Sequence, residues 1–258
     1  MSAASPQQLQ RGSRVVFDPG EKGIDAGGLT REMYAQFAIQ TLELPPRLRL
    51  FKETAARNLV PEALTPETYG LECERMYRGY GRICGMALAM GELANFTFAP
   101  YFLRQVLLPD SNPSLEERLE ELRLDDPVLV GSMESLLATA AAQMAGEGTA
   151  EGGTVEDLCL TFERRMSTSQ EVLGEERAVS LLDEAGPPAD VTPGSARYFV
   201  ERYIDHKMCD SILEQTQAFR GGMLDVLQEP GLLALFTPAE LGELLGGTAG
   251  IDEVAVAR

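Results

Sequence analysis

The feature that most constrains the fold is a glycine-rich apolar segment between residues 76 and 91. Its apolar residues recur at steps of four and three, as on one face of an α-helix: Met76, Tyr80, Ile83, Ala87 and Met90. Glycines interrupt the segment at positions 79, 81, 85 and 91. A glycine inside a helix weakens it by roughly 1 kcal/mol relative to alanine. We therefore predict a buried helix whose glycines admit another element very close to its backbone.

Helical patterns cover most of the remaining chain. Capping boxes predict helix starts at Ser114 and at Thr237, because each is followed three residues later by glutamate. Asp126-Pro127 opens another helix, and Thr192-Pro193 opens the longest one. A break in that longest helix is expected at Gly221-Gly222. The chain is therefore predicted to be α+β and mainly helical.

The first helix and the short strands are read from weaker patterns. Residues 29–42 have helical periodicity, with Leu29, Met33, Phe37 and Leu42 near one face and Tyr34 and Ala38 beside it. Expected strands cover 14–17, a hairpin at 50–51 and 59–61, and the alternating run 158–162. Thr65-Pro66 has the pattern of a helix start. Residues 145–154 are rich in glycine and are expected to form a flexible loop, whereas 163–190 are expected to be irregular.

Charge excludes one large class of partner. The chain has 22 Lys and Arg against 40 Asp and Glu, a formal net charge of −18. Such a field opposes binding to a phosphate backbone, so we expect no nucleic-acid partner and favour basic protein surfaces. The N-terminus has no apolar core of a signal peptide, and no apolar run approaches the roughly 20 residues of a membrane span. We expect no membrane span and a cytoplasmic protein, with the nucleus as the alternative.

Residues that could carry independent chemistry are few. The four cysteines are unclustered and His206 is the single histidine, so we expect no metal site and no cofactor. His206 and Cys209 share a helix face, which leaves a thiol hydrolase as one minor alternative. Acidic clusters such as Glu116-Glu117 are expected to be solvated helix faces. From the residue types alone, the chain is an acidic helical protein that binds a partner.

Five segments, in order, resemble the HECT domain of ubiquitin ligases. They are GIDAGGLTRE (23–32), GRICGMALAMGELANFTFAPYFLRQVL (81–107), the pair DDPVLVGSMESLL (125–137) and DLCLTFE (157–163), VTPGSARYFVERYIDHKMCDSILEQTQAFRGGM (191–223), and LLALFTPAELGELLGG (232–247). The resemblance implies the N-terminal lobe of that domain, with a large helical subdomain and a small subdomain that binds the ubiquitin-conjugating enzyme. The expected divisions are a disordered 1–13, the lobe at 14–247 with its small subdomain at about 110–190, and a hinge or tail at 248–258.

The same resemblance places the catalytic cysteine in a second, C-terminal lobe. The chain ends at Arg258, where the interlobe hinge is expected to begin, so we expect that lobe to be absent. None of the four cysteines matches the context of the family's active site. The resemblance therefore implies a HECT-type ubiquitin ligase represented by its docking lobe, with conjugating enzyme and ubiquitin as partners and no thioester formed by this chain alone.

The resemblance also implies a hydrophobic groove that receives loops of the conjugating enzyme. The matching positions are Leu129, Ser132, Met133, Leu158, Leu160 and Phe199. The first three are spaced to share a helix face, and Leu158 and Leu160 are spaced to share a strand face. On pattern alone, an ordinary core is the favoured interpretation of these residues, and the resemblance makes a groove equally compatible with them. Two further alternatives remain open: a non-catalytic adaptor or decoy that occupies conjugating enzymes, and a helical scaffold without a ubiquitin role.

Overall fold

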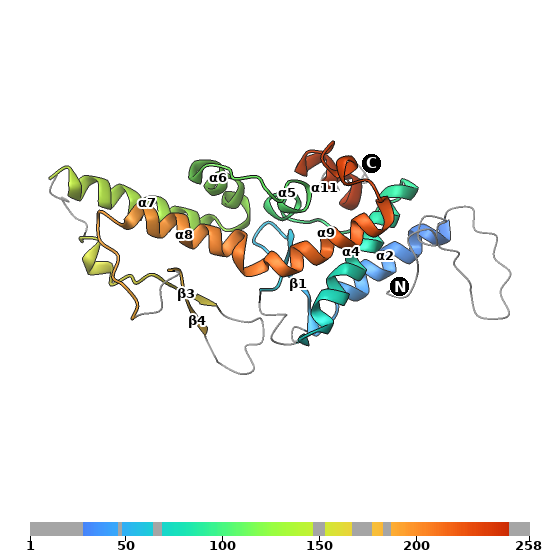
Figure 1. Ribbon diagram of the computed structural model, residues 1–258, viewed down its shortest axis with the longest axis horizontal. Coiled ribbons are helices and arrows are strands. Elements are labelled where there is room, and N and C mark those ends of the chain that lie inside the picture. The colour runs from blue at the N-terminus through green and yellow to red at the C-terminus, as the bar shows by residue number, and fades with distance from the viewer. Residues whose placement is uncertain are drawn as a thin grey trace, which may run out of the picture. The chain divides into compact units, whose positions relative to one another are not determined.

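The computed structural model describes residues 28–45, 48–63, 69–146, 153–166, 177–182 and 187–247 (Figure 1). Contacts divide the chain into two units. Unit 1 combines the residues up to Ser111 with those from Leu213 onward, and unit 2 runs from Asn112 to Ile212. Helices dominate the described residues of both units, and the strands form two antiparallel pairs. The fold is therefore α+β and mainly helical, as the sequence predicts.

Unit 1 is built on two helices that run side by side, α4 (Glu72–Met90) and α9 (Leu213–Leu227) (Figure 1). A Cβ atom at Gly81 would overlap the carbonyl oxygen of Phe219, and one at Gly222 would overlap that of Arg78. At Gly85 a Cβ would lie 3.1 Å from the carbonyl oxygen of Met223. The predicted close approach is therefore confirmed, and it is made by backbone against backbone.

The other two glycines of the segment have different roles. Nothing lies within 4 Å of a Cβ built at Gly79. Gly91 caps the C-terminus of α4 with φ of 67°, a conformation that glycine adopts without steric cost. Two of the four glycines thus serve the contact with α9, one ends the helix, and one faces open space.

The buried face of α4 differs from the predicted one. Met76 and Met90 are exposed, whereas Tyr77 and Cys84 are fully buried. Burial on α4 follows Gly81 and Gly85, because the close backbone contact decides which side turns inward. The periodic apolar stripe overlaps that side only in part.

Helix α2 (Gly28–Leu42) shows a similar shift. Its buried residues are Thr30, Tyr34, Ala38 and Thr41. The inner face is therefore the one that carries Tyr34 and Ala38, beside the predicted apolar stripe. The hydroxyl of Thr41 donates a hydrogen bond to the carbonyl of Phe37 at 2.8 Å and lies 3.0 Å from the hydroxyl of Tyr80. Hydrogen bonding thus allows a polar residue to occupy the inner face.

Aromatic rings fill the core of unit 1. The predicted hairpin is confirmed as β1 (Phe51–Glu53) and β2 (Leu59–Pro61), which pair antiparallel with Phe51 opposite Pro61. Phe51 and Phe98 place their ring centroids 6.5 Å and 5.4 Å from that of Phe219 on α9. Helix α5 (Pro100–Leu107) closes this core with Phe102, whose ring lies 5.3 Å from that of Phe219.

Two short helices complete unit 1, α10 (Pro230–Leu233) and α11 (Pro238–Gly246). The capping box predicted at Thr237 is confirmed: its side chain accepts from the amide of Glu240, whose carboxylate accepts from the amide of Thr237. The amide of Asn95 donates to the carbonyl of Leu245 at 2.9 Å, which ties α11 to the segment after α4.

Unit 2 contains three helices in its described residues, α6 (Leu115–Asp125), α7 (Pro127–Met144) and α8 (Ala196–Met208). Helices α7 and α8 lie side by side (Figure 1). Arg118 forms an ion pair with Asp205, and Lys207 Nζ lies 2.8 Å from Asp126 Oδ2, so α8 is held to α6 and to the start of α7. The capping box predicted at Ser114 is confirmed.

The long helix predicted after Thr192-Pro193 is two helices. Helix α8 ends at Met208, the 3-10 turn η3 (Asp210–Ile212) follows, and α9 begins at Leu213. Gly221-Gly222 does not break α9, because the missing side chain of Gly222 is what admits the backbone of Arg78. The division between the two units falls at this turn, so α8 belongs to unit 2.

The strand predicted at 158–162 is also corrected. The 3-10 turn η2 (Glu156–Leu158) ends where that strand was expected to begin, and Cys159 adopts φ of 48°. The Asp157 carboxylate accepts from the amide and the hydroxyl of Thr154, at 2.6 Å and 2.9 Å, which favours a turn over an extended run. The strands β3 (Glu163–Met166) and β4 (Arg177–Ser180) instead form an antiparallel pair in a stretch expected to be irregular.

Several predictions fall outside the described residues. They concern the disordered 1–13, the strand at 14–17, the glycine turns before Gly28, the helix start at Thr65-Pro66, most of the loop at 145–154, and the tail at 248–258.

Candidate functional site

A cavity of about 1010 Å³ lies within unit 2. We call it the unit 2 cavity. Helices α7 and α8, the residues around η2 and strand β3 supply its walls. Its lining comprises Pro127, Val128, Gly131, Ser132, Met133, Ser135, Leu136, Thr139, Gly153, Leu158, Cys159, Leu160, Thr161, Glu163, Arg165, Phe199 and Tyr203. The cavity is thus mainly apolar and hydroxylic, with one carboxylate and one guanidinium from β3.

Five of the six residues expected in a docking groove line this cavity. They are Ser132, Met133, Leu158, Leu160 and Phe199. Leu129 does not line it, although helical spacing places Leu129 on the same side of α7 as the lining residue Met133. The residues come together although Leu158 and Leu160 do not share a strand face.

The cavity has a buried floor and an exposed apolar rim. Met133 and Phe199 are buried, and the Phe199 ring lies 5.5 Å from that of Phe162 and 5.8 Å from that of Tyr203. At the rim, Val128 is 79 % exposed and Leu158 is 51 % exposed. Exposed apolar side chains beside a cavity are typical of a surface that another molecule covers.

The turn around Cys159 explains why Leu158 is exposed. The amide of Leu158 donates to Val155 and that of Cys159 donates to Glu156, which closes η2. Cys159 then turns the chain, with its backbone in the left-handed region. The carbonyl of Leu160 accepts a hydrogen bond from the amide of Val191 at 2.8 Å. Local hydrogen bonding therefore presents Leu158 outward without a strand.

Sequence reasoning missed several lining residues. Val128 precedes Ser132 by one helical turn, and Tyr203 follows Phe199 by one turn, so helical spacing could have added both. Glu163 and Arg165 could not have been found in this way, because the strand that carries them was expected to be irregular. They bring charge to one wall of an otherwise uncharged cavity.

The geometry around His206 does not support a thiol hydrolase. Arg164 Nη1 lies 2.8 Å from His206 Nδ1. An arginine can only donate, so Nδ1 must accept and the ring proton is on Nε2. Burial and the neighbouring Arg164 lower the pKa of His206. The nitrogen lone pair that a general base would need is therefore already engaged.

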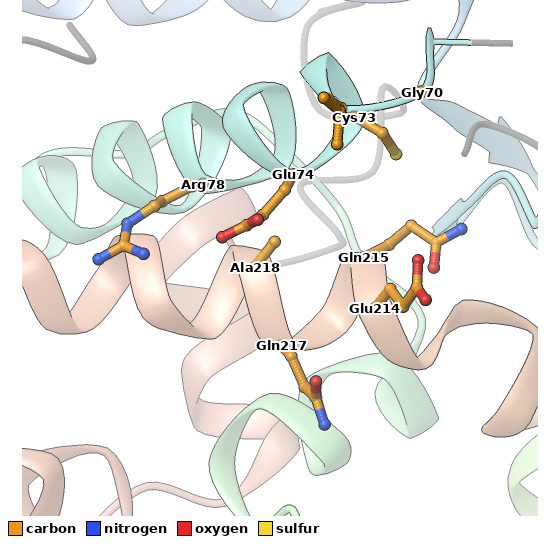
Figure 2. Close-up of a pocket in the computed structure, with 9 residues that line it drawn as sticks. Gly70, Cys73, Glu74, Arg78, Glu214, Gln215, Gln217 and Ala218 are labelled. Carbon is orange, nitrogen blue, oxygen red and sulfur yellow. The ribbon is translucent and has the colours of Figure 1, made fainter. Parts of the chain in front are cut away.

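A second cavity, of about 500 Å³, lies within unit 1 where α4 and α9 begin (Figure 2). Figure 2 shows Glu74 pointing from α4 toward Ala218 on α9, while Gln217 points away from α4. Arg78 also lines this cavity, but its guanidinium makes two hydrogen bonds, of 2.8 Å and 2.7 Å, to Asp225. The cavity thus places the carboxylates of Glu74 and Glu214 beside a guanidinium that Asp225 already binds, and it gathers no recognisable catalytic set.

Within the described ranges, no group of three or more His, Cys, Asp or Glu side chains is placed to hold a metal ion. No helix in the described part of the chain is both long and apolar enough to cross a membrane. The unit 2 cavity is therefore the candidate site.

The family profile of the HECT-domain (ubiquitin-transferase) matches residues 38–257. The chain belongs to this family, which confirms the resemblance seen in its sequence segments. The match includes every residue that lines the unit 2 cavity.

Similar proteins are ubiquitin ligases of several organisms. The chain is 27 % identical over 247 residues to the E3 ubiquitin-protein ligase TOM1-like of Neurospora crassa, covering 95 % of this chain and 5 % of that protein. It is 26 % identical over 250 residues to the E3 ubiquitin-protein ligase RSP5 of Saccharomyces cerevisiae, covering 96 % of this chain and 27 % of that protein. It is 27 % identical over 254 residues to the human E3 ubiquitin-protein ligase HECW1, covering 97 % and 14 %. The chain thus spans between 5 % and 27 % of the length of these three relatives.

Proposed function

We propose that this chain acts in HECT-type ubiquitin transfer as the part that docks the ubiquitin-conjugating enzyme, and that the unit 2 cavity is the docking site. One observation carries the proposal: a chain of this family has an open cavity with an exposed apolar rim. Five of the six residues expected in the family's groove line it.

The shape of the cavity fits a loop tip with an apolar side chain. Val128 on α7 and Leu158 after η2 form the exposed rim, and Met133 and Phe199 form the floor. An apolar tip seated here would remove Leu158 and Val128 from water, at about 25 cal/mol per Å² of apolar area. One such anchor contributes perhaps 1–2 kcal/mol of affinity, so we expect a transient complex that buries less than roughly 1,200 Å² in total.

The net charge of −18 supports a partner with a basic docking surface. Charge of opposite sign on the two proteins accelerates encounter, and the effect weakens as salt is added. A conjugating enzyme loaded with ubiquitin, acting in the cytoplasm, is the partner we propose.

We further propose that the chain carries no thioester-forming cysteine. Burial raises the pKa of the Cys84 thiol, so this thiol stays protonated at neutral pH. Cys73 is also buried, and Cys159 lies in the lining of the docking site itself. The chain incubated with loaded conjugating enzyme is expected to form no reducible ubiquitin adduct on a non-reducing gel.

The docking site is tested by NMR titration of the chain with a panel of conjugating enzymes. We expect shifts at the residues of the unit 2 cavity and a Kd at least about tenfold higher for Leu158→Asp, since a carboxylate at the rim must be desolvated. Leu160→Asp is the second variant. Leu124→Asp is the matched control, because Leu124 lies in the same unit on α6, is 71 % exposed and lies outside the lining. Equal loss in both Leu158→Asp and Leu124→Asp, or no binding across the panel, would contradict the proposal.

A further inference from the structure

Arg164 is a buried cation on the strand beside the docking site. It lies on β3, is 8 % exposed, and points its guanidinium at α8 and η3. Its Nη1 lies 2.8 Å from His206 Nδ1 and 3.4 Å from Ser211 Oγ, and its Cζ lies 5.8 Å from the centroid of the Tyr203 ring. One side chain thus connects the strand to two other elements of unit 2.

The alternation of β3 couples this contact to the cavity. Successive side chains of a strand point to opposite faces, so Glu163 and Arg165 point away from Arg164. Both line the unit 2 cavity, as does Tyr203, whose ring Arg164 also contacts. The position of this wall of the cavity therefore depends on where Arg164 is held.

The contact exists for only one protonation state of His206. Arginine has no acceptor, so Nδ1 must offer its lone pair, which the imidazolium form lacks. Protonation would also place two cations at the 2.8 Å separation of the present hydrogen bond. Neutral His206 accordingly holds Arg164, and protonated His206 repels it.

The other charges around His206 do not remove this conflict. Asp210 on η3 favours the protonated ring, whereas burial, Arg164 and Arg202 oppose it, and together they lower the pKa of His206. The charged neighbours of His206 along α8 are engaged elsewhere, since Asp205 pairs with Arg118 on α6 and Lys207 pairs with Asp126. Protonation below neutral pH is thus opposed chiefly by desolvation and by Arg164.

We propose that Arg164 and His206 are a positioning pair that makes docking at the unit 2 cavity depend on pH. Neutral His206 fixes Arg164, and through it the wall formed by Glu163, Arg165 and Tyr203. Protonation of His206 releases that wall and weakens docking. This inference rests on the proposed function, because the readout is the binding of a conjugating enzyme.

The experiment measures the Kd for one conjugating enzyme from pH 7.5 to pH 5.5, for the wild type and for His206→Asn. The amide oxygen of asparagine can occupy the place of Nδ1 and accept from Arg164 at every pH. Linkage to one proton limits the change to tenfold per pH unit. Between pH 7.5 and pH 5.5, we expect the Kd of the wild type to rise by roughly fivefold more than the Kd of His206→Asn. Titration of the partner affects both proteins alike and cancels in the ratio.

Direct observation of the imidazole gives a second readout that needs no variant. His206 is the single histidine of the chain, so its NMR signals need no assignment. Its nitrogen shifts should show the proton on Nε2, and its titration should move to lower pH when the conjugating enzyme is bound, because docking favours the neutral ring.

The variant Arg164→Met tests the other member of the pair. It should bind the conjugating enzyme more weakly at pH 7.5 and lose the extra pH dependence.

The possible results separate the two proposals. Identical pH profiles for the wild type and His206→Asn, or a His206 titration that is unchanged by docking, would overturn the positioning role and leave the docking site intact. Absence of docking at pH 7.5 would instead overturn the proposed function, and the inference would fall with it.

Discussion

Helix contacts in the two units follow opposite designs. In unit 1, α4 and α9 touch backbone to backbone at Gly81 and Gly222, and no side chain separates them there. In unit 2, α7 and α8 pack through side chains and share the walls of a cavity of about 1010 Å³. The rim of that cavity leaves Val128 and Leu158 exposed. The comparison indicates that unit 1 is built for rigidity, whereas unit 2 keeps apolar surface available to a partner.

The largest expected effect comes from breaking the backbone contact. Gly81→Ala adds a methyl group where the Phe219 carbonyl oxygen lies, so α4 and α9 must separate. We expect the free energy of unfolding to fall by about 3 kcal/mol, at the upper end of overpacking costs. Urea denaturation followed by circular dichroism measures the change.

Gly79→Ala is the matched control in the same helix. Nothing lies within 4 Å of a Cβ at Gly79, so the substitution should raise the free energy of unfolding by about 0.5–1 kcal/mol through helix propensity. Similar stability changes in the two variants would show that the backbone contact is not what distinguishes unit 1.

The second-largest expected effect comes from the ion pairs beside the backbone contact between α4 and α9. Asp225 on α9 accepts from Arg78 and Arg82 on α4, at distances of 2.7–2.8 Å. Asp225→Asn should lower the free energy of unfolding by about 1–2 kcal/mol, because the largely buried Arg82 loses its counter-charge and the half-exposed Arg78 loses a pair that solvent partly screens. Thermal and urea unfolding of both proteins at pH 7 measure the loss.

The pH dependence of that loss gives an internal check. The hydrogen bond from Arg78 lowers the pKa of Asp225 in the folded chain. A carboxyl group whose pKa is lower in the folded chain stabilises the fold at every pH above its unfolded pKa of about 3.9. That stabilisation is lost as the pH falls through the pKa of the folded chain. The difference between wild type and Asp225→Asn should therefore narrow below about pH 4. A difference that is constant with pH would indicate a packing effect instead of a charge effect.

Features fixed within one element were easier to predict from the sequence than features that depend on how two elements pack together. The capping boxes at Ser114 and Thr237 were predictable because the residues that satisfy each other are three apart. The close approach at Gly81 was predictable because glycine has few other uses in a helix. The buried face of α4 was predicted wrongly at Met76 and Met90, because the position of α9 decides it and the sequence of α4 alone does not.

The candidate site shows the same division. The family resemblance supplied all five of the expected residues that line the cavity, and helical spacing was consistent with it on α7. The strand predicted around Leu160 was wrong, because a turn stabilised by Thr154 and Asp157 competes with alternation over so short a run. The charged wall from β3 was missed, since a four-residue strand gives too few positions for a period of two to be recognised.

The smallest expected effect compares one helix start in each unit. Ser114 caps α6 in unit 2 and Thr237 caps α11 in unit 1, and both are full capping boxes. Ser114→Ala and Thr237→Ala should each lower the free energy of unfolding by about 1 kcal/mol. Amide hydrogen exchange should locate each loss in the helix that is altered. If rigidity is a property of unit 1 as a whole, exchange in α11 will rise only at its first turn, whereas in unit 2 the loss at α6 will spread to α8 through the Arg118–Asp205 ion pair. Equal spreading in both units would contradict the contrast between a rigid and an open unit.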